Sequence, residues 1–207
     1  EIPETGRFVL VEDYEIRGGG IVREALRDRQ AWVRERVFLR NYHWDPSEIS
    51  PEQRAQRFGQ LPHLVLVTGT NATDRKGLAR ELEARLFADG RVVYFFGIGN
   101  LLYGVDADIG REEGDRSEHM RRLAEIANLM LDSGMIVVVS GSELRAEELE
   151  IIKASIDPGL VTTVWMGSPS AALLPVNIHI SDDTAHEDAA DQIKTYLQGL
   201  GVMFRPW

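Results

Sequence analysis

The sequence predicts an α/β protein, in which a three-layer domain with a mostly parallel sheet follows a short β-hairpin and a linker helix. Beyond residue 61, short runs rich in Val and Ile alternate with stretches of helical spacing, which is typical of a parallel sheet covered by helices. The chain has 207 residues, 43% of them hydrophobic, which is enough for one such domain and a smaller appendage.

The overall charge and composition limit the classes of ligand that we expect the chain to bind. The chain carries 23 Lys and Arg against 33 Asp and Glu, and its net charge of -10 gives no global attraction to nucleic acid or anionic lipid. It has no cysteine, which excludes disulfides, thiolate nucleophiles and Cys-ligated metal within it. No apolar run approaches the roughly 20 residues that span a bilayer. We therefore expect a cytoplasmic protein whose partners are neither membranes nor nucleic acid.

Residues 1–22 predict two short strands. An apolar run over 8–11 and a glycine-rich run over 18–22 flank a polar connection. An isolated two-stranded ribbon is marginal in water, so we expect these strands to need a neighbouring sheet. Because the chain opens on Glu1 rather than Met, we interpret it as a fragment of a longer protein.

Residues 23–60 predict a linker. The stretch 24–40 is highly charged with only loosely spaced apolar residues, which indicates a helix lying across a surface. The stretch 41–60 contains few apolar residues and two prolines, and predicts a connection with one helical turn after Ser50. We place the boundary between the two units in that connection.

Residues 61–207 predict the main domain. Its strands are expected at 64–67, 92–96, 135–139 and 160–166. The clearest helix spans 115–132, where apolar residues form one broad stripe, and a last helix is expected over 188–200. These stripes indicate helices that pack on the sheet.

The turn after the first strand of this domain is where a sheet of this kind would bind phosphate. A working phosphate loop needs two glycines, a lysine and then Ser or Thr, and Gly69 supplies the first glycine. Asp74 stands at the second glycine, Arg75 at the lysine and Lys76 at the first hydroxyl position. We expect a degenerate loop without bound phosphate, in which Asp74 caps a helix that begins near Arg75.

Several stretches of the main domain carry a resemblance to a known family. The first comprises residues 67–69 and 78–94, and the second is the run DRSEHMRRLAEIA over 115–127. Further matches lie at 108–110 and 134–140. Over most of residues 61–200, the chain resembles adenylylsulfate kinases, which phosphorylate adenosine 5′-phosphosulfate. The resemblance implies a kinase-like P-loop fold.

The chain departs from that family at the functional positions. Where the family has Asp-Gly-Asp-Asn-x-Arg, residues 97–102 read GIGNLL, so that only Asn100 matches. Arg116 matches a substrate-binding arginine, whereas His119 stands in place of an asparagine. The resemblance therefore implies a vestigial substrate site made of Asn100, Arg116 and His119.

Two further departures affect substrate binding. Arg111 replaces an aromatic residue of the family, and the run 165–169 leads almost directly to 176–180, so the family's mobile lid is missing. Together with the broken loop, these differences imply that no catalytic residue and no metal ligand remains, and that the domain holds no cofactor.

Three arginines on the predicted helix over 115–132 leave two interpretations open. Arg116, Arg121 and Arg122 could bind an anion, because guanidinium groups pair well with phosphate or sulfate. Salt bridges with Glu118 and Glu125 on the same helix explain at least two of them equally well.

The N-terminal strands carry a second, shorter resemblance. Residues 6–11 together with 18–22 resemble the final hairpin of the third, β-barrel domain of elongation factor Tu-like GTPases. These GTPases include the large subunit of sulfate adenylyltransferase, which in some proteins is fused to an adenylylsulfate kinase. The resemblance implies an upstream GTPase domain as partner, and leaves open a sulfate adenylyltransferase subunit and a homodimer.

Three functions are compatible with these residues. The first is a non-catalytic kinase-like domain that acts as a scaffold or regulator at the C-terminus of a sulfate-activating GTPase. The second is a divergent kinase that uses Lys76 with ATP and Mg²⁺, and the third is a nucleotide-sensing module that uses Asn100 and Arg116. The selective loss of site residues beside intact core runs favours the first.

Overall fold

The computed structural model describes residues 7–21, 28–70, 72–110, 112–141, 144–168 and 174–203, without the side chains of residues 72, 73 and 113. By its internal contacts the chain divides into two units, Glu1–Ala31 and Trp32–Trp207. The expected linker helix is α1, Ala31–Tyr42, and the division falls directly after its first residue, upstream of the stretch 41–60 in which we had placed a boundary. The first part of the expected helix, up to residue 27, lies outside the described residues.

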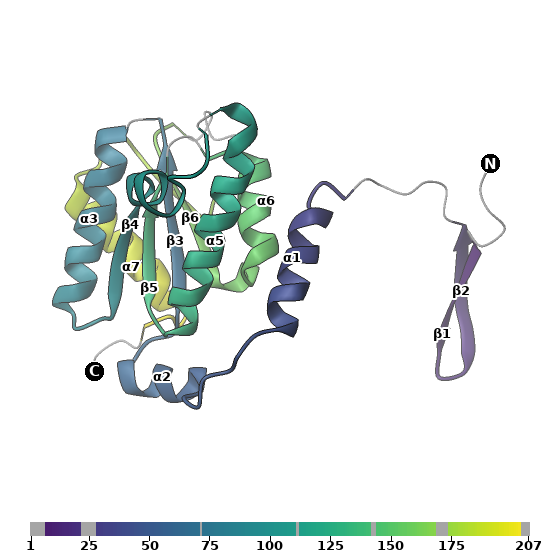
Figure 1. Ribbon diagram of the computed structural model, residues 1–207. Helices are drawn as coiled ribbons and strands as arrows, with labels where there is room; N and C mark the ends of the chain where they lie inside the picture. Colours follow the sequence, from purple (N-terminus) through teal and green to yellow (C-terminus); the bar gives the residue numbers. More distant parts are fainter. Residues whose placement is uncertain are drawn as a thin grey trace. The chain divides into compact units, whose positions relative to one another are not determined.

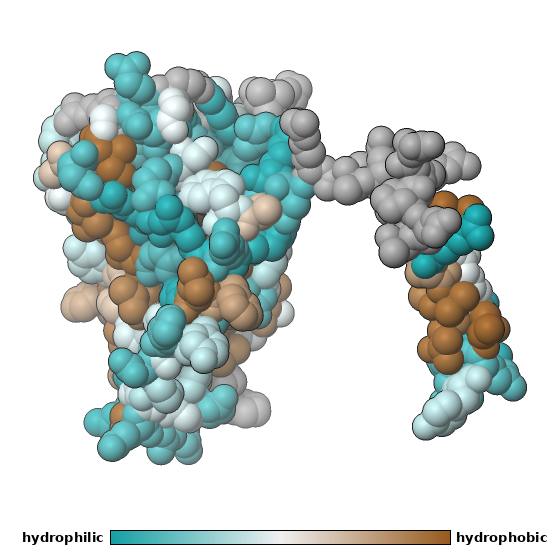
Figure 2. All heavy atoms as spheres, turned by 45° about the vertical axis from the view of Figure 1, so that its right-hand side comes forward, coloured by the Kyte–Doolittle hydropathy of each residue, from teal (hydrophilic) through white to brown (hydrophobic). Residues whose placement is uncertain are grey.

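The smaller unit contains the predicted hairpin. Strands β1 (Arg7–Glu12) and β2 (Glu15–Ile21) pair antiparallel around Asp13 and Tyr14, which both have positive φ, as a two-residue hairpin turn requires. Apolar side chains along the hairpin are exposed, and Figure 2 shows them as a brown band above its polar tip. The residues concerned are Phe8, Val9, Leu10, Val11, Ile16 and Ile21.

The larger unit is built on a five-stranded parallel sheet, as predicted. Its strands are β3 (His63–Gly69), β4 (Val93–Gly97), β5 (Ile136–Ser140), β6 (Val161–Met166) and β7 (Ile178–Ile180), in the order β4-β5-β3-β6-β7. Every neighbouring pair in this sheet is parallel. The first four strands confirm the expected runs to within one or two residues, whereas β7 was not predicted.

Helices cover both faces of this sheet. Besides α1, the larger unit contains α2 (Pro51–Phe58), α3 (Ala72–Ala88), α4 (Ile98–Asn100), α5 (Arg116–Asp132), α6 (Ala146–Ser155) and α7 (His186–Gly199), with short turns η2 (Leu101–Val105), η3 (Glu113–Asp115) and η4 (Pro158–Leu160). In Figure 1, α3 and α7 lie against one face and α5 and α6 against the other. The predicted three-layer architecture is therefore confirmed.

The central strand shows how the two apolar layers form. Along β3, Leu64 and Leu66 belong to the cluster with α5 and α6, whereas Val65 and Val67 belong to the cluster with α3 and α7. All four side chains are buried because successive residues of a strand face opposite sides of a sheet that is covered on both. A continuous apolar run is the sequence signature of such a strand.

Helix α2 is longer than the single turn we expected. Ser50 caps it by accepting a hydrogen bond from the backbone N–H of Gln53, and the Gln53 side chain accepts one from the Ser50 backbone N–H. Pro51 occupies the first turn and Gly59, with φ of 63°, ends the helix. Two complete caps stabilise a helix whose apolar content is low.

The topology brings the ends of three strands together. Val67 of β3 and Gly97 of β4 are both in register with Ser140 at the end of β5. The connections that follow these strands therefore leave the same edge of the sheet, which we call the carboxyl edge. In parallel α/β sheets this edge is where ligands bind.

Candidate functional site

The loop after β3 has the glycine of a phosphate loop at its first position. Gly69 has φ of 144°, and a Cβ there would overlap the Met166 carbonyl of the neighbouring strand, so glycine is required. Helix α3 begins at Ala72, which places Asp74 within its first turn. Our expectation that Asp74 caps a helix beginning near Arg75 was therefore wrong.

Arg75, which stands at the lysine position of a phosphate loop, is buried. Its side chain is 4% exposed and reaches back across the turn, where Nη1 donates a hydrogen bond to the Gly69 carbonyl. The buried guanidinium thus lies within the loop that would hold phosphate. Lys76, the next residue, is exposed.

The stretch after β4 forms the second part of the edge. Residues 98–105 coil into α4 and the π-helical turn η2, and a backbone N–H from Asp106 returns to the Leu101 carbonyl. Asn100, which alone matches the family's acidic run, is exposed at the end of α4. Leu101 is fully buried, so an apolar anchor occupies this stretch.

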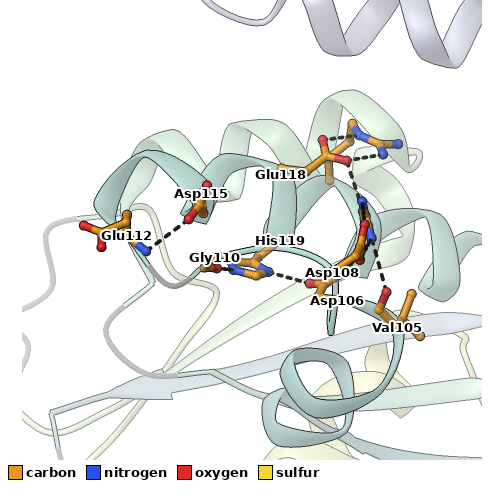
Figure 3. A network of polar contacts seen from close by, with 10 residues as sticks. Val105, Asp106, Asp108, Gly110, Glu112, Asp115, Glu118 and His119 are labelled. Carbon is orange, nitrogen blue, oxygen red and sulfur yellow. Dashed lines mark hydrogen bonds and ion pairs between the residues drawn. The ribbon is translucent and has the colours of Figure 1, made fainter.

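His119 is held at both ring nitrogens by groups of the segment before α5. Nδ1 lies 2.6 Å from Oδ2 of Asp106, and Nε2 lies 2.9 Å from the Gly110 carbonyl (Figure 3). His119 and Asp106 are both buried, Asp106 completely. The polar atoms of the His119 ring face the protein and not a ligand.

Two of the three arginines on α5 pair with carboxylates. Arg121 donates to Glu118 at 2.6 and 2.8 Å, and Arg122 donates to Glu118 at 3.1 Å and to Asp108 at 2.7 and 3.0 Å. The hydrogen bonds that Glu118 accepts, that from Arg121 first and that from Arg122 second, lower its pKa to about 2. Of the two interpretations left open above, salt bridges therefore account for Arg121 and Arg122. Glu125, which we had considered as a further partner, pairs with Arg40 of α1 at 2.9 Å.

Arg116 pairs outside its own helix. Its Nε donates to Oε1 of Glu148, the third residue of α6, at 2.6 Å. The other oxygen of Glu148 accepts the backbone N–H of Arg145 at 2.8 Å, which fixes the carboxylate at the start of α6. The Glu148 side chain is 6% exposed and that of Arg116 is 35% exposed. The arginine that matches the family's substrate clamp is therefore already neutralised by the chain itself.

A cavity of about 130 Å³ lies at the carboxyl edge between α5 and α6. Arg116 and His119 both line it, together with apolar side chains from β3, β5, α5 and α6. Asn100 is not among its lining residues. The structure thus brings together two of the three predicted substrate residues and leaves the third exposed.

Two residues of the site were missed by sequence reasoning. Asp106 and Glu148 hold His119 and Arg116, respectively, yet nothing in their spacing marked them as partners. Arg111 and the stretch 169–173, where we expected the lid to be missing, lie outside the described residues. Within the described part of the chain, no cluster of three His, Asp or Glu residues could hold a metal ion. No described helix is long and apolar enough to cross a membrane.

Comparison with protein families and curated proteins gives a consistent result. The family described as adenylylsulphate kinase matches residues 61–171. The bifunctional enzyme NodQ of Rhizobium sp. is 30% identical over 167 residues, which are 80% of this chain and 24% of that protein. The adenylyl-sulfate kinase of Shewanella pealeana is 33% identical over 126 residues, which are 61% of this chain and 62% of that protein. The chain thus spans less than two thirds of the length of these relatives.

Solved structures share the fold. A mutant of the APS kinase CysC from Mycobacterium tuberculosis has a TM-score of 0.60 and 26% identity, and the match covers 67% of this chain and 99% of that one. The hexameric APS kinase from Thiobacillus denitrificans has a TM-score of 0.62 and 18% identity, over 75% of this chain and 33% of that one.

Proposed function

Because the chain belongs to the adenylylsulphate kinase family, we propose that it is a non-catalytic member, a scaffold or regulator at the C-terminus of a sulfate-activating, elongation factor Tu-like GTPase. The single observation that carries this proposal is Arg75, whose buried guanidinium bonds to the Gly69 carbonyl inside the phosphate loop. A nucleotide phosphate in the loop would have to compete with that carbonyl for the guanidinium.

The chemistry of phosphoryl transfer supports this proposal. Transfer depends on a compact ammonium at the phosphates and on a hydroxyl that holds Mg²⁺. Arginine at the lysine position has a rigid planar fork, and neither Lys76 nor Gly77 can supply the hydroxyl. Asp74 adds a negative charge in the first turn of α3, where phosphate oxygens would meet backbone N–H groups. The residues present do not fit ATP with Mg²⁺, so we expect no bound cofactor.

The substrate side of the site supports the same proposal. In a working clamp, Arg116 would be free to pair with the anionic substrate. Here Glu148 pairs with it at 2.6 Å and is itself buried. His119, at the position of the family's asparagine, is bonded to Asp106 and Gly110. In the phosphate loop and in the substrate clamp alike, the polar groups thus have partners within the chain.

An activity assay separates this proposal from a divergent kinase. The full chain is incubated with adenylylsulfate, ATP and Mg²⁺, and formation of the 3′-phosphorylated product is measured beside a reaction without protein. We expect no product above that background. Product that disappears in the Lys76→Ala variant would overturn the proposal in favour of a kinase that uses Lys76.

A single repair of the loop is expected to fail. Asp74→Gly removes the negative charge and restores the glycine, yet Arg75 remains in the loop and the hydroxyl positions remain wrong. We therefore expect no calorimetric heat of ATP binding to this variant. A saturable ATP signal from Asp74→Gly would show that Asp74 alone had closed the loop.

The hairpin supports the proposed partner. Its exposed apolar side chains on β1 and β2 need a covering sheet, which we propose is the β-barrel of an upstream GTPase domain. The relatives named bifunctional enzyme NodQ are much longer than this chain, which spans 24% of the first of them. A sulfate adenylyltransferase subunit and a second copy of the chain are two further candidates that we propose as partners of this scaffold. A nucleotide-sensing role is the alternative, and ligand titration tests it below.

A further inference from the structure

We propose that the cavity between α5 and α6 binds a small neutral molecule of about the size of one aromatic ring. The inference does not depend on whether the domain is a kinase, because it concerns the shape and polarity of the cavity. The cavity has a volume of about 130 Å³. An apolar cavity of about 150 Å³ is large enough for benzene and stays free of water when nothing polar lines it.

The walls of the cavity are mostly apolar. Side chains from β3, β5, α5, α6 and the loop before α6 line it, and they are Leu66, Met120, Leu123, Val139, Leu144 and Ile152. All six are buried. Filling such a space with an apolar guest removes guest surface from water, at roughly 25 cal/mol for each Å². A polar guest would lose its hydration without gaining partners from these walls.

The polar side chains in the walls already have partners in the protein. Thr68 Oγ1 accepts the Leu144 backbone N–H at 2.9 Å. Both nitrogens of His119 are bonded, and Glu148 pairs with Arg116 through one oxygen and with a backbone N–H through the other. The charges of Arg116 and Glu148 offset one another. The site therefore favours a neutral guest over an anion such as adenylylsulfate.

One side of the cavity remains open to solvent. Ile98, Leu102 and Arg116 line it and are partly exposed, whereas the apolar residues at its base are buried. A guest can therefore enter past α4 and η2, which carry Ile98 and Leu102. These two residues are where the sequence departs from the family's acidic run, so the departure itself supplies an apolar entrance.

Methyl-detected NMR titration of the full chain tests the inference. Toluene is the neutral probe, and benzoate is a matched probe with the same ring and a carboxylate. We expect saturable shifts of the Leu123 and Ile152 methyl signals with toluene, and NOEs from toluene to those methyl groups. Benzoate should bind about tenfold or more weakly, because its carboxylate would lose hydration and would have to compete with Glu148 for Arg116.

Two variants locate the binding. Leu102→Trp places a larger side chain at the entrance and should weaken toluene binding about tenfold or more. Leu129→Trp makes the same change on the exposed face of α5, where Leu129 is 60% exposed, and should leave binding unchanged. The NOEs in the unmodified chain do not depend on how well either variant folds.

The outcomes divide as follows. Absence of saturable shifts with toluene, equal binding of benzoate, or equal effects of the two tryptophans would overturn the inference. Competition of toluene by adenylylsulfate at micromolar concentration would also overturn it, since an anionic nucleotide would then be the preferred occupant. Toluene binding together with kinase activity would sustain the inference while refuting the proposed function.

Discussion

Buried side chains have different kinds of partner in the core beneath α3 and at the carboxyl edge of the sheet. Later turns of α3 bury Leu78, Leu82 and Leu86 against β3 and α7, and these side chains need only apolar neighbours. At the edge, Arg75 on the first turn of the same helix is also buried, and its guanidinium bonds to Gly69. One helix thus joins an ordinary core to a site whose polar groups face inward.

This difference between core and edge explains how a ligand site can be lost while the fold is kept. Burying a charged group is costly unless it is paired. In an active site the ligand supplies part of that pairing, whereas here Glu148 and Asp106 supply it for Arg116 and His119. Apolar core residues are not affected when groups of the chain replace a ligand as the partners of these side chains. The fold can therefore remain kinase-like while the edge is rebuilt.

The largest expected effect compares two positions on α3. Leu82→Ala should lower the free energy of unfolding by about 2–5 kcal/mol, because Leu82 is fully buried and the variant leaves a cavity. Lys76→Ala should change it by less than about 0.5 kcal/mol, because Lys76 is exposed. Urea unfolding of both variants measures the contrast. Similar losses would show that the first turn of α3 is as tightly constrained as its core.

The next effect concerns a buried histidine in the core. His63 is 2% exposed, bonds to Thr162 Oγ1 at 2.8 Å, and has its pKa lowered to about 4 by burial. As the pH falls, the unfolded chain takes up a proton on this histidine before the folded chain does. The contribution of His63 to the free energy of unfolding is therefore complete above about pH 6.5, and it decreases by about 3 kcal/mol as the pH falls toward 4. His63→Gln should flatten this part of the stability profile in urea unfolding at several pH values. The matched variant His179→Gln, at an exposed position, should leave it intact.

A smaller effect tests the edge directly. Glu148→Gln removes the charge that neutralises Arg116 and should destabilise the domain by about 1–2 kcal/mol, since Arg116 is partly exposed and water replaces some of the lost attraction. Glu150→Gln on the exposed side of α6 is the matched control and should cost less than about 0.5 kcal/mol.

A double variant shows whether the two charges act as a pair. Glu148→Gln combined with Arg116→Gln should cost less than the sum of the single changes, because the second change removes a charge that the first has left unpaired. Thermal or urea unfolding of the four proteins gives the coupling free energy. Additive losses would mean that Arg116 and Glu148 stabilise the edge independently.

The sequence predicts the core well because its signals are local. The Val- and Ile-rich runs and the apolar stripe of α5 identify strands and helix from neighbouring residues alone. The start of α3 was misplaced by three residues, since Asp74 is as suitable for a first turn as for a cap.

The edge could be predicted only in part. Comparison by position identified Arg75 and His119 as altered and Arg116 as a match, but not what each would contact. The partner of Arg116 comes from a distant part of the chain, since Glu148 is 32 residues away. No local pattern encodes such a pairing, because it depends on the packing of α5 against α6.

Isothermal titration of the full chain with ATP and Mg²⁺, GTP, ADP and adenylylsulfate in separate runs tests the central claim most directly. The claim is that the chain's own groups, Arg75 above all, occupy the positions where a kinase of this family would hold its nucleotides. We expect no saturable heat with any of the four. Binding of ATP by the unmodified chain with a Kd on the order of micromolar would contradict the claim.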